Sequence, residues 1–285
     1  MTNFETKIAS WKHMPQSVDG EQLFAIGDIH GQAEAFNATL SVLAGIPRAA
    51  TMRRLVLLGD VIDRGPASLE AIRLAGDAKV LALVDDVFIL PGNHELMLID
   101  AIDDPMMFMG DWLDNGGEEL ILEAVPNCTA RLLADFADIA RRAVPSSFLE
   151  QMRNGPTSLL VGDLLMVHAG LNPEREALDF LSEPRDAVAG SDHWAWIREP
   201  FLRWQGGWGP ELNWAVVHGH TPAVSKLVTA EIFTAEADKL TDHSRICLDA
   251  GSATGIPQIG WAEFHDGRYR LGITSQSDNG GEENQ

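Results

Sequence analysis

The first third of the chain alternates between short apolar runs and stretches with helical spacing. Three runs rich in Val, Ile and Leu are predicted strands, namely Leu23–Ile26, Leu55–Leu58 and Val87–Leu90. Between them, Ala33–Leu43 carries apolar residues at helical spacing, and Pro66 suits the first turn of a helix that runs through Leu74. Strands and helices that alternate in this way predict βαβ units and a layered α/β core.

The strand pattern disappears after Leu96. Residues 96–156 carry helical patterns instead, and Gly116-Gly117 and Pro126 divide them into short helices. We expect a helical insertion that covers one side of the candidate site described below. Residues 1–21, at the other end of the pattern, predict a peripheral segment that Trp11 would attach to the body.

Strand patterns return in the second half of the chain. A hairpin is predicted from Ser158–Val161 and Leu164–Val167, which flank Gly162-Asp163. The irregular region that follows contains or borders five of the eight tryptophans, Trp194, Trp196, Trp204, Trp208 and Trp214. Further predicted strands are Ala215–Val217, Lys226–Phe233, Arg245–Leu248, Gln258–Phe264 and Tyr269–Ile273. Residues 275–285 are polar and acidic, and we expect a disordered tail.

The composition narrows the class of partner. Acidic residues outnumber basic ones 42 to 21, and the net charge of −21 disfavours a nucleic acid or an anionic membrane as partner. A phosphate ligand stays compatible with this charge, because bound divalent ions reverse the local potential of a site. Cys128 and Cys247 follow no metal-binding spacing and are interpreted as small buried hydrophobes. No apolar run reaches about 18 residues, so a cytoplasmic location is expected.

Residues able to bind metal follow five of the apolar runs. The junctions are GDIHG (27–31), GDVIDRG (59–65), GNHE (92–95), HAG (168–170) and HGHT (218–221). They offer Asp28, His30, Asp60, Asn93, His168 and His220. Mixed oxygen and imidazole ligands suit Mn, Fe or Zn better than thiophilic metals. Six ligands are too many for one tetrahedral zinc but suit two ions that share a carboxylate, an arrangement that clamps an in-line displacement at phosphorus.

Each junction alone also has a simpler interpretation. Gly-Asp is common in turns, Asn93 is a favoured helix N-cap residue, and His168 alone would be a buried structural histidine. The five together, in this order and each at a strand end, favour the metal site.

The motif series resembles the calcineurin-like metallophosphoesterases, specifically the phosphoprotein phosphatase branch in its bacterial form. That group includes the bacterial serine/threonine phosphatases and the symmetrical dinucleoside tetraphosphatases. The Arg-Gly that follows Asp63 is typical of the branch, and so is Thr221. Residues 248–255 resemble the closing LDTGA segment, although Ala250 and Ser252 replace its Thr and Ala. The resemblance covers nearly the whole chain.

The resemblance implies a four-layer α/β (α+β) fold, in which two mixed β-sheets form a sandwich flanked by helices. Residues 1–274 would then be a single metallophosphoesterase catalytic domain with the helical insertion at about 96–156, and residues 275–285 the tail.

The family pattern also implies a role for each motif residue. The first metal would be held by Asp28, His30 and Asp60, and the second by Asp60 as a bridge with Asn93, His168 and His220. His94 would donate a proton to the leaving oxygen, while Asp63 orients it and keeps it cationic.

Phosphate oxygens would be held by Arg64, Arg198 and Asn93. A planar guanidinium such as that of Arg64 matches phosphate with a bidentate fork. Arg198, in WIREPF, is the candidate for a second phosphate-binding arginine, and its alternative is an ion pair with Glu199 on the surface.

The implied activity is that of a metal-dependent phosphoric ester hydrolase. A metal-bound hydroxide would attack phosphorus in line, with two divalent ions as cofactors, Mn²⁺ favoured and Fe or Zn as alternatives. We expect a serine/threonine protein phosphatase that acts on a phosphoprotein or a small phosphorylated substrate. The alternative is a hydrolase of dinucleoside polyphosphates or other nucleotides, for which the tryptophans could stack on a nucleobase. The sequence leaves the oligomeric state open.

Overall fold

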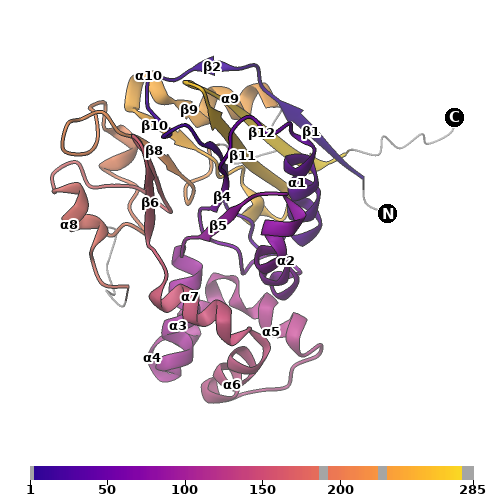
Figure 1. Ribbon diagram of the computed structural model, residues 1–285. Helices are drawn as coiled ribbons and strands as arrows, with labels where there is room; N and C mark the ends of the chain where they lie inside the picture. Colours follow the sequence, from indigo (N-terminus) through magenta and orange to yellow (C-terminus); the bar gives the residue numbers. More distant parts are fainter. Residues whose placement is uncertain (1–2, 186–191, 224–229, 278–285) are drawn as a thin grey trace, which may run out of the picture.

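Two mixed β-sheets pack face to face with helices on their outer sides (Figure 1). The computed structural model describes residues 3–185, 192–223 and 230–277. The seven-stranded sheet has the order β1 (Phe4–Ile8), β12 (Arg268–Gln276), β11 (Gln258–His265), β3 (Gln22–Ile26), β4 (Arg53–Leu57) and β5 (Asp86–Ile89), and β2 (Lys12–His13) also pairs with β12. The five-stranded sheet has the order β6 (Ser158–Val161), β7 (Leu164–Val167), β8 (Ala215–His218), β10 (Arg245–Cys247) and β9 (Asp238–Lys239). The predicted fold class is confirmed.

The central strands are buried on both faces. Leu23 and Ala25 of β3 belong to the core between the two sheets, whereas Phe24 and Ile26 belong to the core beneath the helices. The strands β4 and β7 alternate in the same way, β7 between the inter-sheet core and a third core on the outer side of the five-stranded sheet. Strands covered on both faces need apolar side chains at every position. This explains why they appear in the sequence as continuous apolar runs.

Helices cover the outer face of the seven-stranded sheet and fill the predicted insertion. The sheet is covered by α1 (Ala33–Gly45) and α2 (Ser68–Leu81). The insertion consists of α3 (Asn93–Asp103), α4 (Pro105–Trp112), a π-helical turn (Leu113–Gly117), α5 (Glu118–Ala124), α6 (Leu133–Ala143) and α7 (Ser146–Asn154), which form the lower lobe in Figure 1. The later helices are α8 (Ala177–Leu181), α9 (Ala230–Ala237) and α10 (Leu240–His243), with single 3-10 turns at Phe201–Arg203 and Ser252–Thr254.

The strand predicted at Lys226–Phe233 is wrong where the structure describes it. Residues 230–237 form helix α9, and residues 226–229 lie outside the described residues. Phe233 and Ala237, four residues apart, both enter the core between the sheets, which is the spacing of one helix face. The Ala and Glu residues of this segment also favour a helix over a strand.

Two strands lie near the ends of the described part of the chain. The predicted peripheral segment supplies β1, an edge strand antiparallel to β12. Trp11 lies 4.5 Å from the guanidinium carbons of both Arg268 and Arg270, so it does attach this segment to the body. Strand β12 runs to Gln276, two residues into the predicted tail, and residues 278–285 lie outside the described part. The predicted domain division stays a prediction.

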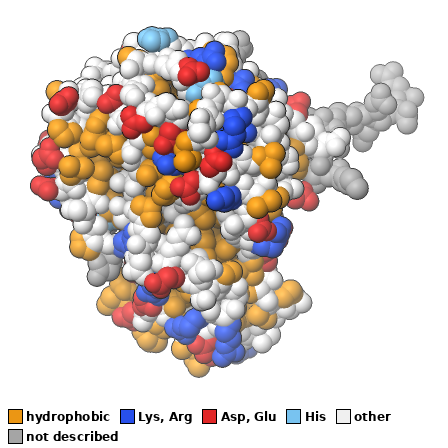
Figure 2. All heavy atoms as spheres, viewed as in Figure 1, with side chains coloured by type: hydrophobic (Ala, Val, Ile, Leu, Met, Phe, Trp, Pro, Cys, Tyr) orange, Lys and Arg blue, Asp and Glu red, His pale blue; other side chains and the backbone are white. Residues whose placement is uncertain are grey.

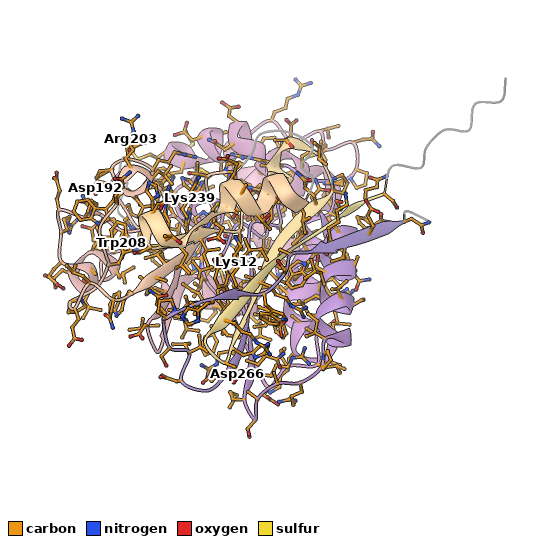
Figure 3. All side chains as sticks on the ribbon, turned by 90° about the horizontal axis from the view of Figure 1, so that it is seen from above. Lys12, Asp192, Arg203, Trp208, Lys239 and Asp266 are labelled. Carbon is orange, nitrogen blue, oxygen red and sulfur yellow. The ribbon has the colours of Figure 1, made fainter. Side chains whose placement is uncertain are left out.

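The two sheets are also joined by a polar contact near their ends. Lys12 of β2, labelled in Figure 3, donates to a carboxylate oxygen of Asp238 at 2.7 Å, and the Tyr269 hydroxyl donates to the same oxygen at 2.6 Å. Positive and negative side chains are interspersed with apolar ones on the face shown in Figure 2. Among the described residues, every helix is too short or too polar to cross a bilayer.

Candidate active site

The predicted ligands meet because the strands that carry them are parallel. The strands β3, β4 and β5 run in parallel, as do β7 and β8, so their carboxyl ends open at the same edge of each sheet. The six predicted metal ligands follow these ends and are at most 7% exposed: Asp28, His30, Asp60, Asn93, His168 and His220.

Asp60 lies at the centre of this cluster. Its carboxylate oxygens are 3.5 Å from His30 Nε2 and 3.4 Å from His168 Nε2. Two groups of three side chains bring their ligand atoms within 4.8 Å of one another, His30 with Asp60 and His94, and Asp60 with His168 and His220. Because Asp60 belongs to both groups, it occupies the place expected of a bridging ligand.

Asn93 and Asp28 complete the cluster from two sides. The Asn93 amide oxygen is 3.1 Å from His168 Nε2 and 2.9 Å from His220 Nδ1. Asp28 Oδ2 is 3.9 Å from His30 Nε2, and both oxygens of its carboxylate accept the backbone N–H of His220. Asp28 therefore contacts the backbone of His220. The first group of three contains His94 and not Asp28.

Each predicted histidine ligand turns one ring nitrogen toward the cluster and binds a backbone carbonyl with the other. His30 Nδ1 donates to the carbonyl of Ile62 at 3.0 Å, and His168 Nδ1 donates to that of Leu58 at 2.9 Å, which leaves both Nε2 atoms facing Asp60. His220 donates from Nε2 to a backbone carbonyl at 3.1 Å, which leaves Nδ1 facing the Asn93 amide oxygen. In the neutral rings of His30 and His220 the inward-facing nitrogen then carries a lone pair that can bind a metal ion. Metal-binding histidines commonly have this backbone contact, so the donor set fits two divalent ions.

The pKa values of the histidines agree with this fit. Burial lowers the pKa of His30 to about 3 and that of His220 to about 2, so both are neutral imidazoles, the form that binds metal. Burial also disfavours the charged form of His168, but the nearby Asp60 carboxylate outweighs it and raises the pKa of His168 to about 10. Without a metal ion, the negative charge of Asp60 therefore favours a protonated His168 at the place where a cation would bind.

The loops that carry these side chains adopt an unusual backbone conformation. The φ angles of His30, Asp60 and His220 are 46°, 50° and 65°, and those of Asp63 and Arg64 are 69° and 68°. Each such residue costs about 1–3 kcal/mol, a strain that clusters at functional sites.

Glu95 holds two of the loops together. Its buried carboxylate accepts the backbone N–H groups of Asp60 at 2.9 Å, Val61 at 2.8 Å and Gly92 at 2.8 Å. The loops lie so close that a Cβ atom on Gly92 would collide with the Asp60 carboxylate, so glycine is needed there. Burial, helped by Asp60, raises the pKa of Glu95 to about 7. Glu95 therefore supports the loop that carries the predicted bridging ligand.

His94 and Asp63 form the predicted pair. His94 Nδ1 donates to Asp63 Oδ2 at 2.9 Å, and both side chains are buried. Burial works against the charged form of His94, but Asp60 and Asp63 outweigh it and raise the pKa of His94. Trp112 donates its indole N–H to the same oxygen of Asp63 at 2.9 Å, a contact that the sequence interpretation missed. The available signal was a tryptophan two residues before the polar turn Asp114-Asn115-Gly116-Gly117.

The two predicted phosphate-binding arginines are exposed and lie on different sides of the cluster. The positive charge of Arg64 contributes to lowering the pKa of His30, and that of Arg198 contributes to lowering the pKa of His220, in each case after burial. Glu199 forms its ion pair with Arg203 at 3.0 Å. The alternative interpretation of Arg198 as the partner of Glu199 is therefore not what the structure shows.

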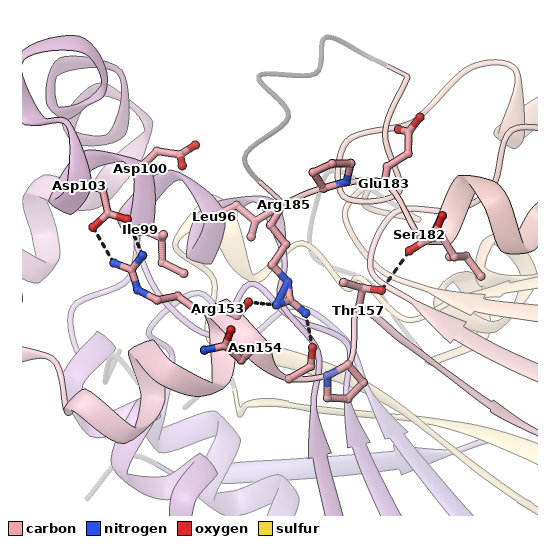
Figure 4. Close-up of a pocket in the computed structure, with 14 residues that line it drawn as sticks. Leu96, Ile99, Asp100, Asp103, Arg153, Asn154, Thr157, Ser182, Glu183 and Arg185 are labelled. Carbon is pink, nitrogen blue, oxygen red and sulfur yellow. Dashed lines mark hydrogen bonds and ion pairs between the residues drawn. The ribbon is translucent and has the colours of Figure 1, made fainter.

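A cavity of about 730 Å³ opens between α3, α7 and α8, but it has none of the predicted ligands in its lining (Figure 4). Its two arginines are already bound, since Arg153 pairs with Asp103 and Arg185 donates to the carbonyls of Arg153 and Gly155. A phosphate would have to displace these partners. We therefore place the candidate site at the Asp60 cluster.

Comparisons with known proteins identify the family of the chain. A profile of the family described as calcineurin-like phosphoesterase matches residues 22–237. The symmetrical bis(5'-nucleosyl)-tetraphosphatase of Acidovorax ebreus (strain TPSY) is 28% identical over 198 residues, which cover 67% of this chain and 60% of the relative. The serine/threonine-protein phosphatase 2 of Escherichia coli (strain K12) is 32% identical over 99 residues, which cover 34% of this chain and 38% of the relative.

A solved structure described as "a putative diadenosine tetraphosphatase" shares the fold. Its TM-score is 0.51 at 17% identity, and the match covers 92% of this chain and 96% of that one. The family match supports a metal-dependent phosphoester hydrolase. The chain spans 60% of the length of its tetraphosphatase relative, so that match leaves the substrate open. The chain belongs to the calcineurin-like phosphoesterase family.

Proposed function

We propose that this chain is a dimetal hydrolase that cleaves a phosphoanhydride bond in dinucleoside polyphosphates of the diadenosine tetraphosphate type. The observation that carries the hydrolase is the convergence of buried imidazole nitrogens on the shared Asp60 carboxylate. The relative named as a symmetrical tetraphosphatase supports the substrate class, because that match covers 67% of the chain whereas the match to the protein phosphatase covers 34%.

The role of each residue is taken from the family pattern. Asp28, His30 and Asp60 would hold one ion, and Asp60, Asn93, His168 and His220 the other. When bound, the metal pair supplies Lewis-acid activation of water and neutralises charge on the phosphate. Mn²⁺ is the favoured ion, with Fe and Zn as alternatives.

The remaining residues act on the substrate itself. Arg64, Arg198 and Asn93 would hold phosphate oxygens. His94 would give the proton on its Nε2 atom to the leaving oxygen, while Asp63 holds Nδ1 and stabilises the charged imidazole. No covalent bond between enzyme and substrate is needed.

The tryptophans restrict where a nucleobase could stack. Trp194, Trp208 and Trp214 are at most 7% exposed and pack in the core outside the five-stranded sheet, so they are not free to stack on a base. Trp204 is 39% exposed and Trp196 is partly buried, so these two are the available candidates in this region.

A serine/threonine protein phosphatase is the second candidate, and it was our first expectation from the motifs. It is supported by the 32% identity to the Escherichia coli phosphatase over 99 residues. The same residues would hold the metal ions, and water would attack a phosphate monoester instead of an anhydride. The absence of nucleic-acid and membrane partners and the cytoplasmic location stay predictions.

The test is parallel turnover by protein stripped of metal and reconstituted with Mn²⁺. ADP release from diadenosine tetraphosphate is compared with phosphate release from a phosphoserine peptide, with Asp60→Asn as the control. Preference for the dinucleotide supports the proposal, and preference for the peptide favours the second candidate. If neither is hydrolysed, or if Asp60→Asn is as active as the wild type, the proposed function is wrong.

A further inference from the structure

The helical insertion carries Asn93 and His94 in α3, and it also contacts the loop of Asp63 and Arg64 through residues 112–117, the end of α4 and the turn before α5 (Figure 1). The Trp112 indole Nε1 donates to Asp63 Oδ2 at 2.9 Å. The backbone N–H of Arg64 donates to the Gly116 carbonyl at 3.0 Å, and Arg64 Nε donates to the Asn115 carbonyl at 3.3 Å. The turn therefore contacts Asp63 and Arg64, the two adjacent residues with proposed roles in proton transfer and phosphate binding.

Among the described residues, few hydrogen-bond donors contact the Asp63 carboxylate. It is fully buried, and within the described residues its Oδ1 atom has no hydrogen-bond partner. Its Oδ2 atom receives both side-chain donors, His94 Nδ1 and Trp112 Nε1, each at 2.9 Å. A buried carboxylate is stable only when it is well hydrogen-bonded. Without the indole N–H, His94 would be its one remaining side-chain donor among the described residues.

Two glycines of the turn allow the Trp112 indole to lie next to Asp63. Trp112 is fully buried, and a Cβ atom on Gly117 would collide with its ring. Gly116 has a φ of 106°, and a Cβ atom there would lie 2.6 Å from Arg64 Cγ. The two glycines thus allow the closest approach of the insertion to the loop that carries Asp63.

We propose that Trp112 is a positioning residue for the general acid. Its indole N–H fixes the Asp63 carboxylate, which in turn orients His94 so that Nε2 faces the leaving oxygen. This inference rests on the proposed function, because the role of His94 belongs to it. It also gives residues 112–117 a part in the reaction beyond covering the site.

The test is Trp112→Phe, which keeps a large aromatic ring and removes the N–H group. The matched control is Trp261→Phe, because Trp261 is equally buried but its indole N–H has no partner among the described residues. Both variants are made in the wild-type and His94→Ala backgrounds. We measure kcat and KM on diadenosine tetraphosphate and on a phosphoserine peptide, and we check metal content and thermal unfolding for each protein.

We expect Trp112→Phe to lower kcat by about 10-fold or more, a part of the roughly 10²–10⁴-fold that a general acid contributes. KM should stay within about twofold, and in the His94→Ala background the same substitution should cost nothing further, because it acts through His94. Trp261→Phe should leave kcat within about twofold in both backgrounds.

Equal effects of the two tryptophan variants, or a Trp112→Phe loss that persists undiminished without His94, would overturn the inference while leaving the proposed function intact. A wild-type chain that binds metal and hydrolyses neither substrate would overturn the proposed function, and this inference with it.

Discussion

His94 lies where either a proton donor or a metal ligand would fit. Its Nε2 atom is 4.0 Å from Asp60 Oδ2, and its ring lies edge-on to His30 with centroids 4.7 Å apart. The other ring nitrogen donates to Asp63, a carboxylate that favours the cationic, proton-donating form. We predict that His94→Ala keeps both metal ions and loses about 10²–10⁴-fold in kcat on a substrate with a poor leaving group.

Metal analysis after dialysis measures the first part of this prediction, and turnover of an alkyl phosphate measures the second. His30→Ala serves as the control, because it should lose metal. If His94→Ala also lost one equivalent of metal, His94 would be a ligand and the proton donor would have to be sought elsewhere.

At the scale of elements, the turn at Gly116 controls how Arg64 is presented. Gly116 has a left-handed φ of 106°, and the Cγ atom of Arg64 lies 2.6 Å from the position of an added Cβ. We predict that Gly116→Ala displaces Arg64 and raises KM, and the inhibition constant of inorganic phosphate, by roughly 10-fold, as the loss of a charged hydrogen bond of about 1.5–3 kcal/mol would do.

Product-inhibition kinetics measure this effect. Gly110→Ala is the matched control, since Gly110 lies in helix α4 with no atom within 4 Å of an added Cβ. A Gly116→Ala protein with an unchanged inhibition constant would show that Arg64 does not hold phosphate through this turn.

His193, in the tryptophan-rich region, should lower the stability of the folded chain in acid. Its Nδ1 atom accepts the N–H of Ala195 at 3.1 Å, and Nε2 donates to the carbonyl of Pro184 at 3.1 Å, so the folded chain holds the neutral ring. Burial lowers the pKa of His193 below its ordinary value of 6.5. As pH falls below 6.5 the unfolded chain takes up a proton that the folded His193 does not, so stability decreases.

We predict that this residue contributes a loss of at most about 1.4 kcal/mol per pH unit below its unfolded pKa and none above it. Urea unfolding of the wild type and His193→Gln at pH 7.5 and 5.5 measures it, because all other histidines are shared. The variant should lose less stability on acidification. An equal loss in both proteins would exclude His193 as a source of the acid sensitivity.

The elements that carry the site could be predicted because their environment imposes one kind of residue. The strands β3, β4 and β7 are covered on both faces, so their apolar runs end abruptly where the ligands begin. The helix α9 was mistaken for a strand because Ile232 and Phe233 suit either state in a short apolar run. Trp112 was missed because its partner, Asp63, is distant in sequence, and no local pattern reveals a contact between remote segments.

At the scale of the molecule, the pairing of the two sheets was available only from the family resemblance. The alternation of Leu23 and Phe24 shows that two different layers cover β3, but it does not show which other strands form the second layer. That assignment depends on long-range packing, such as the core that Leu23 of β3 shares with Met166 of β7. Likewise, the motifs suggested a ligand set. Only the folded chain shows which ring nitrogen of each histidine faces the cluster.

The charge of the whole molecule should act on the rate at which substrate arrives. The chain carries a net charge of −21, which repels a polyphosphate at long range, whereas Arg64, Arg198 and bound ions attract it only near the site. Salt screens the long-range part first, because the Debye length falls to about 10 Å at 0.1 M. We predict that kcat/KM for diadenosine tetraphosphate rises a few-fold between about 20 and 200 mM KCl, and rises less for the less charged phenyl phosphate. Steady-state kinetics at constant pH and constant Mn²⁺ measure both slopes. A fall in kcat/KM with salt would mean that the positive groups of the site, and not the net charge of the molecule, govern the approach of the substrate.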